Sequence, residues 1–190
     1  MDTTSILIRS TAVAPLKPLR LGRLSSPIGT LLLVTDDDGA LRALDFDDYE
    51  SRMHRLLRLH YGAYSLRDGT ASADTVHALT NYFAGDLTAI DTIGVATGGT
   101  AFQRTLWSAL RGIRAGTTST YGVLAAHLGR PRASRAVGAA NGANPIAIVV
   151  PCHRVIGASG ELTGYGGGIA RKRWLLDHER RNTMTSDVIA

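Results

Sequence analysis

A short segment, Thr97-Gly98-Gly99, divides this chain into two halves whose charge and residue patterns differ. Residues 1–98 contain 9 Lys and Arg against 12 Asp and Glu, whereas residues 99–181 contain 12 against 3. The 190 residues, 44% of them hydrophobic, suffice for one sizeable core or for a small domain beside a medium one. The basic second half indicates a polyanionic partner such as nucleic acid, although charge alone is equally typical of an ordinary solvated surface.

The first half combines strand and helix patterns. Residues 29–35 and 40–46 are apolar or alternating segments on either side of an Asp-rich turn with a glycine, which predicts a β-hairpin. Helical spacing of apolar residues follows at 51–60 and 74–83, and a glycine stands where the second helix should end. We therefore expect residues 20–94 to form a small αβ domain.

The two ends are expected to lie outside the domains. Residues 1–19 contain two prolines and predict an extension with one short strand at 6–8, and residues 182–190 predict a flexible tail. No apolar stretch approaches the roughly 20 residues that cross a bilayer, and the first residues lack the apolar core of a secretion signal. These features predict a cytoplasmic protein that does not enter a membrane.

The second half, expected as a domain of residues 99–181, is predicted to be mostly helical. Thr100 can cap a first helix, and two further helices at 121–128 and 133–141 flank a tight turn, as in a helix-turn-helix. The last of these helices carries one arginine, Arg135, among small residues. Such a helix can approach a narrow groove closely and read shape rather than sequence. Small residues that only pack this helix against its neighbour would give the same pattern.

Cys152 is the only cysteine, which excludes an intramolecular disulfide and a cysteine-rich zinc site. An apolar run between prolines, residues 145–151, predicts one short buried strand with Cys152 at its end. His153 and Arg154 follow, and both favour the nucleophilic thiolate. His153 reaches the sulfur directly only where the chain turns, and otherwise through a water, because neighbouring strand residues face opposite sides. An inert buried thiol is the commoner fate of a single cysteine, but these flanking residues favour a reactive one.

An acid that orients the imidazole is expected on the last helix. Glu179 lies near the apolar stripe of Leu175 and Leu176, where a carboxylate is costly unless a partner such as histidine pairs with it. Asp177 and His178 are alternatives that point further from this stripe. The sequence therefore predicts a relay that runs from the thiol through the imidazole to Glu179.

The glycine-rich segment at residues 164–168 lacks the lysine and the serine or threonine of a phosphate-binding loop. Its glycines can let the backbone approach a flat ligand or form a pocket wall, with Tyr165 supplying an aromatic face. A plain loop between two elements explains the segment equally well.

The motif Pro151-Cys152-His153-Arg154-Val155 resembles the O6-alkylguanine-DNA alkyltransferases, also called methylated-DNA-protein-cysteine methyltransferases. Further motifs match in family order and spacing, at residues 135–141, 144–145, 164–168 and 172–179. The resemblance is strong over residues 99–181 and extends to residues 20–94 only in general outline. It implies an α/β (α+β) fold in which a small αβ domain with a β-hairpin or sheet precedes a mostly helical domain. The second domain would contain a helix-turn-helix and a short buried strand leading to the cysteine.

The resemblance implies repair of DNA by direct damage reversal. Cys152 would take the alkyl group from O6 of an alkylated guanine, with O4-alkylthymine as a second candidate substrate. The product is a thioether, which water does not cleave as it cleaves an acyl thioester, so each molecule reacts once. By the same resemblance, His153 removes the thiol proton through water, Glu179 orients His153, and Asn144 braces the turn that presents the cysteine.

The resemblance also assigns residues to DNA and to the damaged base. Tyr121 bonds a guanine ring nitrogen, and Arg135 enters the duplex in place of the flipped nucleotide. Arg130 and Gly122 match positions near the phosphates. The base pocket is expected to involve four residues from two segments: Val155, Tyr165, Gly166 and Gly167. Gly166 stands where some relatives carry a serine, so a hydrogen bond to O6 there must come from the backbone.

The expected partner is double-stranded DNA that contains alkylated bases, bound with little sequence specificity by a monomer that can cluster on DNA. No cofactor and no metal are expected, since the zinc site of some animal relatives needs two cysteines. A lesion-binding protein without catalysis is the alternative function, but relatives of that kind lack the cysteine. A cysteine hydrolase, which would turn over repeatedly on an ester or amide, is disfavoured by the basic helix-turn-helix pattern.

Overall fold

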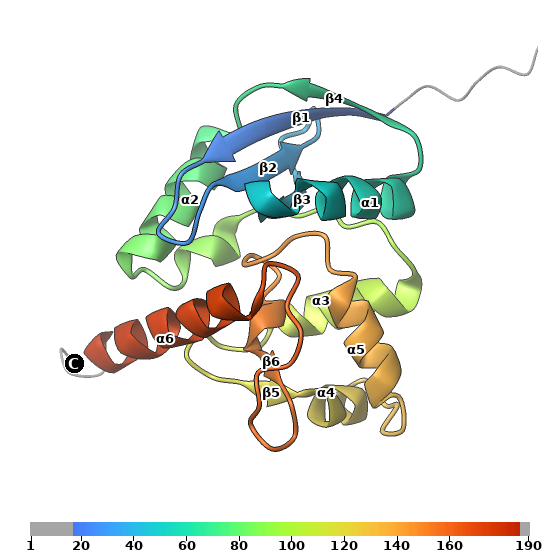
Figure 1. The fold of residues 1–190 in the computed structure, drawn as a ribbon, viewed down its shortest axis with the longest axis vertical. Coiled ribbons are helices and arrows are strands. Elements are labelled where there is room, and N and C mark those ends of the chain that lie inside the picture. The colour runs from blue at the N-terminus through green and yellow to red at the C-terminus, as the bar shows by residue number, and fades with distance from the viewer. Residues whose placement is uncertain (1–16, 187–190) are drawn as a thin grey trace, which may run out of the picture.

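The computed structural model describes residues 17–186, with side chains through residue 183. Its first domain is a four-stranded mixed sheet with two helices (Figure 1). The strand order is β3-β2-β1-β4, in which β1 pairs antiparallel with β2 and parallel with β4. The elements of this domain are β1 Lys17–Leu24, β2 Leu31–Thr35, β3 Leu41–Phe46, the 3-10 helix η1 Asp47–Tyr49, α1 Glu50–Tyr61, β4 Tyr64–Asp68 and α2 Ala73–Ala84.

The predicted hairpin is present as β2 and β3. Leu33 lies opposite Leu44, and Val34 lies opposite Ala43, in an antiparallel register. Every residue of β2 is buried, because α1 packs on one face of the sheet while α2 and the second domain pack on the other. A strand buried on both faces is continuously apolar rather than alternating, which accounts for the run of leucines in β2.

The first domain begins earlier than predicted. β1 starts at Lys17, inside the expected extension. Its side chains alternate between exposed and buried around Leu19 and Leu21, which are both buried. Sequence reasoning missed β1 because Pro18 argues against a strand, and missed β4 because this short edge strand buries little surface. The strand expected at residues 6–8 lies outside the described part of the chain.

Local signals account for the helix boundaries, which lie close to the predicted ones. Ser72 caps α2 by accepting a hydrogen bond from a backbone N–H, and Gly85 ends this helix in the left-handed region with a φ of 114°. In the second domain, Thr100 and Gln103 form a reciprocal capping box at the start of α3.

The second domain is mostly helical, as predicted. Its helices are α3 Ala101–Arg111, α4 Tyr121–His127, α5 Ser134–Gly142 and α6 Ile169–Ser186, and its strands β5 Ser119–Thr120 and β6 Val155–Ile156 pair in parallel. Besides η1, the described residues form two further 3-10 helices, η2 Ala89–Thr92 and η3 Cys152–Arg154. α4 and α5 pack side by side in the predicted helix-turn-helix (Figure 1). Within residues 17–186, none of the helices is both long and apolar enough to span a bilayer.

The segment 145–151 is buried as expected, but the prediction that it forms a strand is wrong. The chain reverses direction within it, with Ile148 at a φ of 69°. A single-residue bridge joins Ile146 to Leu44 of β3. A short apolar run has the same pattern in a buried strand and in a buried turn, so periodicity does not separate them. The strand β6 follows Cys152 instead of leading to it.

The last helix is longer than predicted. α6 continues to Ser186, whereas a flexible tail was expected from residue 182. Thr183 Oγ1 donates a hydrogen bond to the Glu179 carbonyl, one turn earlier, at 2.8 Å. The last four residues lie outside the described part of the chain.

The two domains share one hydrophobic core. Leu44 of β3 belongs to the same buried cluster as Trp107 of α3 and Ile146. The backbone of Leu44 also bonds the turn: its N–H donates to the Pro145 carbonyl and its carbonyl accepts from Ala147 N–H, each at 2.9 Å. The first domain therefore holds the turn that carries the cysteine.

Because the core is shared, Leu44→Ala should destabilise the whole molecule. Truncation of this fully buried side chain should lower the free energy of unfolding by about 2 to 5 kcal/mol. Urea unfolding, followed by tryptophan fluorescence and by circular dichroism, should show one coincident transition at lower urea. Leu59→Ala, at a side chain that is 62% exposed, is the control and should change stability by less than about 0.5 kcal/mol. Two separate transitions, only one of them moved, would contradict a shared core.

Candidate active site

The Asn144 side chain organises the turn before the cysteine. Its Nδ2 donates to the carbonyls of Ile146 and Val150 at 3.3 and 2.8 Å, and its Oδ1 accepts from Ile146 N–H at 3.0 Å. Asn144 is fully buried, so these backbone groups depend on its amide for their hydrogen bonds. The bracing contacts expected of Asn144 are therefore present.

Cys152 lies at the start of η3, with 5% of its surface exposed. Burial raises the pKa of its thiol, while the Asn144 side chain and the positive charges of Arg52 and Lys172 oppose this shift. The resting sulfur is therefore a protonated thiol. A base must take its proton before the sulfur can act as a nucleophile.

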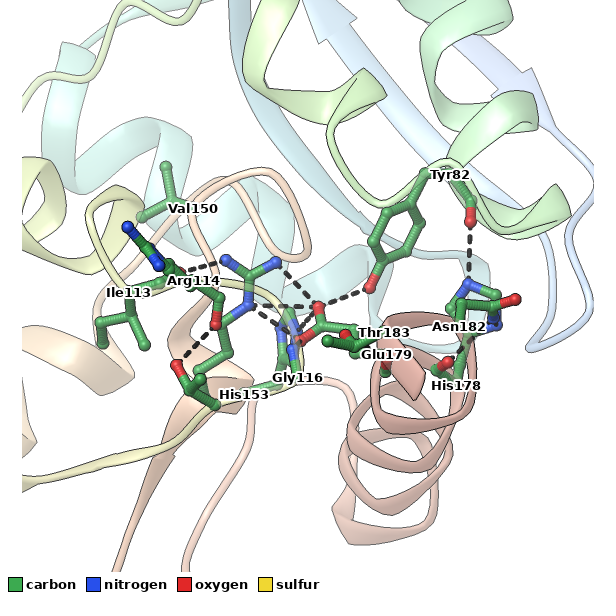
Figure 2. A network of polar contacts seen from close by, with 12 residues as sticks. Tyr82, Ile113, Arg114, Gly116, Val150, His153, His178, Glu179, Asn182 and Thr183 are labelled. Carbon is green, nitrogen blue, oxygen red and sulfur yellow. Dashed lines mark hydrogen bonds and ion pairs between the residues drawn. The ribbon is translucent and has the colours of Figure 1, made fainter. Parts of the chain in front are cut away.

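His153 follows Cys152 in η3 and is fully buried. Its Nε2 lies 2.8 Å from Glu179 Oε1, so the structure brings these two predicted site residues together (Figure 2). Burial lowers the pKa of the imidazole against the opposing effect of Glu179, so the neutral ring carries its proton on Nε2. Nδ1 is buried and has no hydrogen-bond partner among the described residues, which leaves its lone pair available. The described side chains include no direct hydrogen bond from Cys152 to His153, although the chain does turn between them.

The buried Glu179 carboxylate is the centre of a polar network (Figure 2). Besides His153, it accepts hydrogen bonds from Nε and Nη2 of Arg154 at 2.8–3.2 Å, from the Tyr82 hydroxyl at 2.8 Å and from Gly116 N–H at 3.1 Å. Burial alone would raise the pKa of this carboxyl, but His153 and Arg154 outweigh burial and hold the pKa well below its usual range. Glu179 is therefore an anion at neutral pH.

The structure changes the role expected for Arg154. Its guanidinium binds Glu179 and the Ile113 carbonyl, so its charge compensates the carboxylate rather than the thiol. Sequence reasoning missed Tyr82 and Gly116 as partners of Glu179, because both lie far from it in the chain. The available signal was weak: a tyrosine on the apolar face of α2 must find a partner for its hydroxyl.

The alternatives to Glu179 point elsewhere, as expected. His178 Nε2 lies 2.8 Å from the Tyr82 carbonyl, and Asp177 pairs with Arg180 on the surface at 3.5 Å. Among the side chains of residues 17–183, no group of three or more His, Cys, Asp or Glu could hold a metal ion.

Lys172 is a fully buried cation near the cysteine. Its Nζ donates to the carbonyls of Val155 and Thr163 at 2.6 and 2.8 Å, and burial lowers its pKa. Val155, which is expected in the base pocket, thus has its carbonyl bonded to Lys172. Thr163 Oγ1 lies 2.9 Å from the hydroxyl of Tyr121, at the start of α4. The lysine and Thr163 therefore connect α6 to the helix-turn-helix.

Tyr165 lies against the relay. Its ring meets the ring of His153 edge-on, with centroids 6.3 Å apart. The Tyr165 hydroxyl is buried and has no hydrogen-bond partner among the described residues. Burial raises its pKa well above the ordinary value, so it remains a protonated donor. Of the two alternatives for the glycine-rich segment, this position favours a pocket wall.

The glycines of this segment make room for the first domain. A Cβ on Gly166 would overlap the guanidinium of Arg52, and a Cβ on Gly167 would overlap the ring of Phe46. Arg52 in turn pairs with the buried Asp45 at 2.6 Å. Two side chains of the first domain therefore back the segment that adjoins His153.

The helix-turn-helix carries the other residues expected to contact DNA. Arg135 is exposed on α5, Gly122 is exposed on α4, and the Arg130 guanidinium lies 5.2 Å from the centre of the Phe102 ring. Around Arg135, the exposed residues of α5 are small: Ser134, Ala136 and Ala139. Val137 and Ala140 of this helix belong to the core, so packing explains the small residues on its buried side but not the exposed ones.

Two family models match the chain. Residues 19–97 match the ribonuclease-like domain of 6-O-methylguanine DNA methyltransferase, and residues 101–181 match its DNA-binding domain. The methylated-DNA-protein-cysteine methyltransferase of Salmonella typhimurium is 54% identical over 159 residues, which cover 83% of this chain and 93% of that protein. The chain belongs to the O6-methylguanine-DNA methyltransferase family.

Other family members agree over both domains. The Methanosarcina acetivorans methyltransferase is 44% identical over 154 residues, 81% of this chain and 94% of that protein. The crystal structure of the Mycobacterium tuberculosis O6-methylguanine methyltransferase superposes with a TM-score of 0.73 at 44% identity, covering 86% and 94% of the two chains. The structure of the M. tuberculosis protein in complex with DNA gives 0.72 at 45% identity, covering 87% and 94%. These matches confirm the predicted family, its fold class and a DNA-binding methyltransferase of DNA repair.

Glu179→Gln should destabilise the protein at neutral pH, because it leaves Arg154 buried without its counterion. Breaking a buried pair costs about 3 to 5 kcal/mol of unfolding free energy. Folding lowers the pKa of the Glu179 carboxyl. Its contribution to the free energy of unfolding is therefore complete above the ordinary pKa of 4.5 and is lost as the pH falls below that value. The stability difference between the native chain and the variant should therefore narrow between urea titrations at about pH 7 and 3.5. Equal differences at both pH values would contradict this account.

Proposed function

We propose that this chain repairs alkylated DNA by moving the alkyl group from O6 of a guanine to Cys152 in one irreversible transfer. The observation that carries the proposal is the burial of Cys152, His153 and Glu179 together. His153 follows the cysteine in the chain, is held by Glu179 at Nε2, and has no partner at Nδ1 among the described residues. An imidazole held at Nε2 and open at Nδ1 is arranged to accept one proton and to become an imidazolium against a fixed carboxylate.

In the proposed reaction, a water carries the Sγ proton of Cys152 to Nδ1 of His153. Glu179, bonded to Nε2, stabilises the imidazolium. Sγ then bonds to the alkyl carbon while the carbon–O6 bond breaks, and the electron pair of that bond passes to the guanine. The Tyr121 hydroxyl hydrogen-bonds a ring nitrogen and disperses the charge of the departing base, which finally takes up the proton that the thiol released.

The burial of Cys152 supports base flipping, because a base stacked in a duplex could not reach a sulfur that is 5% exposed. Arg135 would occupy the space that the flipped nucleotide leaves. The small exposed residues around Arg135 support close contact with a narrow groove and little dependence on sequence.

Arg130 and Gly122 would lie near the phosphates. A Cβ on Gly122 would meet no atom closer than 3.9 Å, so the fold does not require glycine there. This freedom supports a role for Gly122 in close approach to DNA. The edge of the base would meet backbone near Val155 and Tyr165, with Gly166 and Gly167 in the same wall.

The thioether product is not hydrolysed, so each molecule would accept one alkyl group. We further propose that O4-alkylthymine is a second substrate, and that the protein acts in the cytoplasm as a monomer that can cluster on DNA. A lesion-binding protein without catalysis is the alternative. A cysteine followed directly by a histidine whose Nδ1 has no hydrogen-bond partner among the described residues argues against it.

Incubation with an equimolar duplex that contains labelled O6-methylguanine should place one methyl group on Cys152. Intact-mass and peptide mass spectrometry should report the stoichiometry and the modified residue. Cys152→Ala should gain no label while it still binds the lesion duplex. Loss of the methyl group from DNA over repeated turnovers would indicate a hydrolase, and binding without any transfer would indicate the non-catalytic alternative.

Arg135→Ala should slow transfer from a duplex more than transfer from free O6-benzylguanine, because the arginine acts on flipping. Since flipping costs a few kcal/mol, we expect a loss of about 10- to 100-fold on the duplex and a small change with the free base. Single-turnover rates on both substrates provide the measurement. Arg132→Ala removes an equal charge from a nearby exposed position and is the matched control. Equal losses on both substrates would refute the role.

A further inference from the structure

The hydroxyl of Tyr82, in the first domain, reaches the same carboxylate oxygen as the relay histidine. Tyr82 is a fully buried residue of α2, and its hydroxyl donates to Glu179 Oε1 at 2.8 Å. His153 Nε2 lies 2.8 Å from that same oxygen. Figure 2 shows the tyrosine and the imidazole converging on the carboxylate from different segments. This oxygen also accepts from Nε and Nη2 of Arg154 at 3.2 and 2.8 Å, so the hydroxyl, the imidazole and the guanidinium share one acceptor atom.

The position of this hydroxyl is fixed by the packing of α2 on α6. The Tyr82 carbonyl lies 2.8 Å from His178 Nε2, and the Tyr82 ring meets the His178 ring edge-on at 5.3 Å. At the end of α2, a Cβ on Gly85 would crowd the Asn182 side chain, so the two helices approach closely there. Burial and the adjacent Glu179 charge raise the pKa of the Tyr82 hydroxyl well above its ordinary value. The hydroxyl therefore donates throughout the working pH range.

We propose that Tyr82 is a positioning residue of the relay, which holds Glu179 and limits the basicity of His153. A hydrogen bond donated to a carboxylate oxygen disperses its negative charge. The carboxylate then stabilises less strongly the imidazolium that forms when His153 accepts a proton. Tyr82 thereby adds to the burial that keeps His153 neutral in the resting protein and ready to act as a base. The catalytic part of this inference rests on the proposed function.

The effect of Tyr82 must be measured against the other groups around the histidine. The titratable or charged groups that face His153, besides Glu179, are Arg154 and Cys152 of η3, Lys172 of α6 and Tyr165 of the glycine-rich segment. None of them bonds the Tyr82 hydroxyl, whose hydrogen bond goes to Glu179. A change at Tyr82 therefore acts on the histidine through the carboxylate.

Tyr82→Phe should raise the pKa of His153. The acid limb, which is the low-pH side of the plot of transfer rate against pH, should therefore move to higher pH. A full neighbouring charge shifts a pKa by about one to three units, so loss of one hydrogen bond to that charge should give about half a unit. Two measurements report the shift. One is the pH dependence of single-turnover transfer from a saturating methylated duplex, and the other is the titration of His153 by NMR in nitrogen-15 histidine-labelled protein without DNA.

Tyr61→Phe is the matched control. The Tyr61 hydroxyl is also a hydroxyl of the first domain, but it donates to the backbone carbonyls of Arg42 and Ala96 and has no contact with the relay. This variant should lose stability while its acid limb and its His153 titration stay unchanged.

Site-specific replacement of Tyr82 by 3-fluorotyrosine provides a variant of opposite sign that keeps the ring and the hydroxyl. Fluorine makes the phenol a stronger donor, so the acid limb and the His153 titration should move to lower pH. This protein decides the question even where Tyr82→Phe fails to fold.

The proposal is established if the acid limb and the His153 titration shift in opposite directions in the two Tyr82 proteins and do not shift in Tyr61→Phe. The proposal is overturned if neither the acid limb nor the His153 titration changes in the Tyr82 proteins. It is also overturned if His153 does not titrate in any of the proteins. A loss of rate that is the same at every pH would also overturn it, because a purely structural role predicts that result. If the native chain transfers no methyl group, the proposed function fails, whereas the NMR titration still decides the influence of Tyr82 on His153.

Discussion

The buried pair of Glu179 and Arg154 is the contact on which the rest of the site depends. A buried carboxylate is tolerated only when its charge is compensated and its oxygens are fully hydrogen-bonded. Here Arg154 supplies both the opposite charge and directional hydrogen bonds. The remaining donors are His153, Tyr82 and Gly116, which come from three different parts of the chain. One side chain on α6 therefore fixes the orientation of the imidazole and joins both domains at the same point.

The turn that presents the cysteine is held from the opposite side by the first domain. β3 bonds the backbone of this turn through Leu44, and Arg52 of α1 donates from Nη2 to the Asn144 carbonyl at 3.1 Å. Arg52 is itself held by the buried Asp45. The ribonuclease-like domain is thus part of the construction of the site, since it supports the turn, the glycine-rich segment and the relay carboxylate.

Sequence patterns were sufficient where the determinant is local. The position of Glu179 on the face of a helix depends on neighbouring residues, so its contact with His153 could be predicted. The turn at 145–151 could not, because an apolar run between prolines does not reveal whether the chain extends or reverses. The role of Tyr82 depends on a partner 97 residues away, and the direction of a single long-range hydrogen bond leaves no periodic signal in a sequence.

The positive charges near Cys152 do not ionise its thiol by themselves, because the thiol proton also needs an acceptor. In the resting protein the thiol is neutral because burial opposes a thiolate, and His153 is neutral because burial opposes an imidazolium. In the proposed step, transfer of one proton between them would create two charges at once, and each charge would have a counter-charge nearby. Glu179 faces the imidazolium, whereas Arg52 and Lys172 offset the thiolate. Alkylation of the sulfur removes the thiolate for good, because a thioether cannot ionise. The same electrostatic arrangement that permits the first transfer therefore offers no route to a second one.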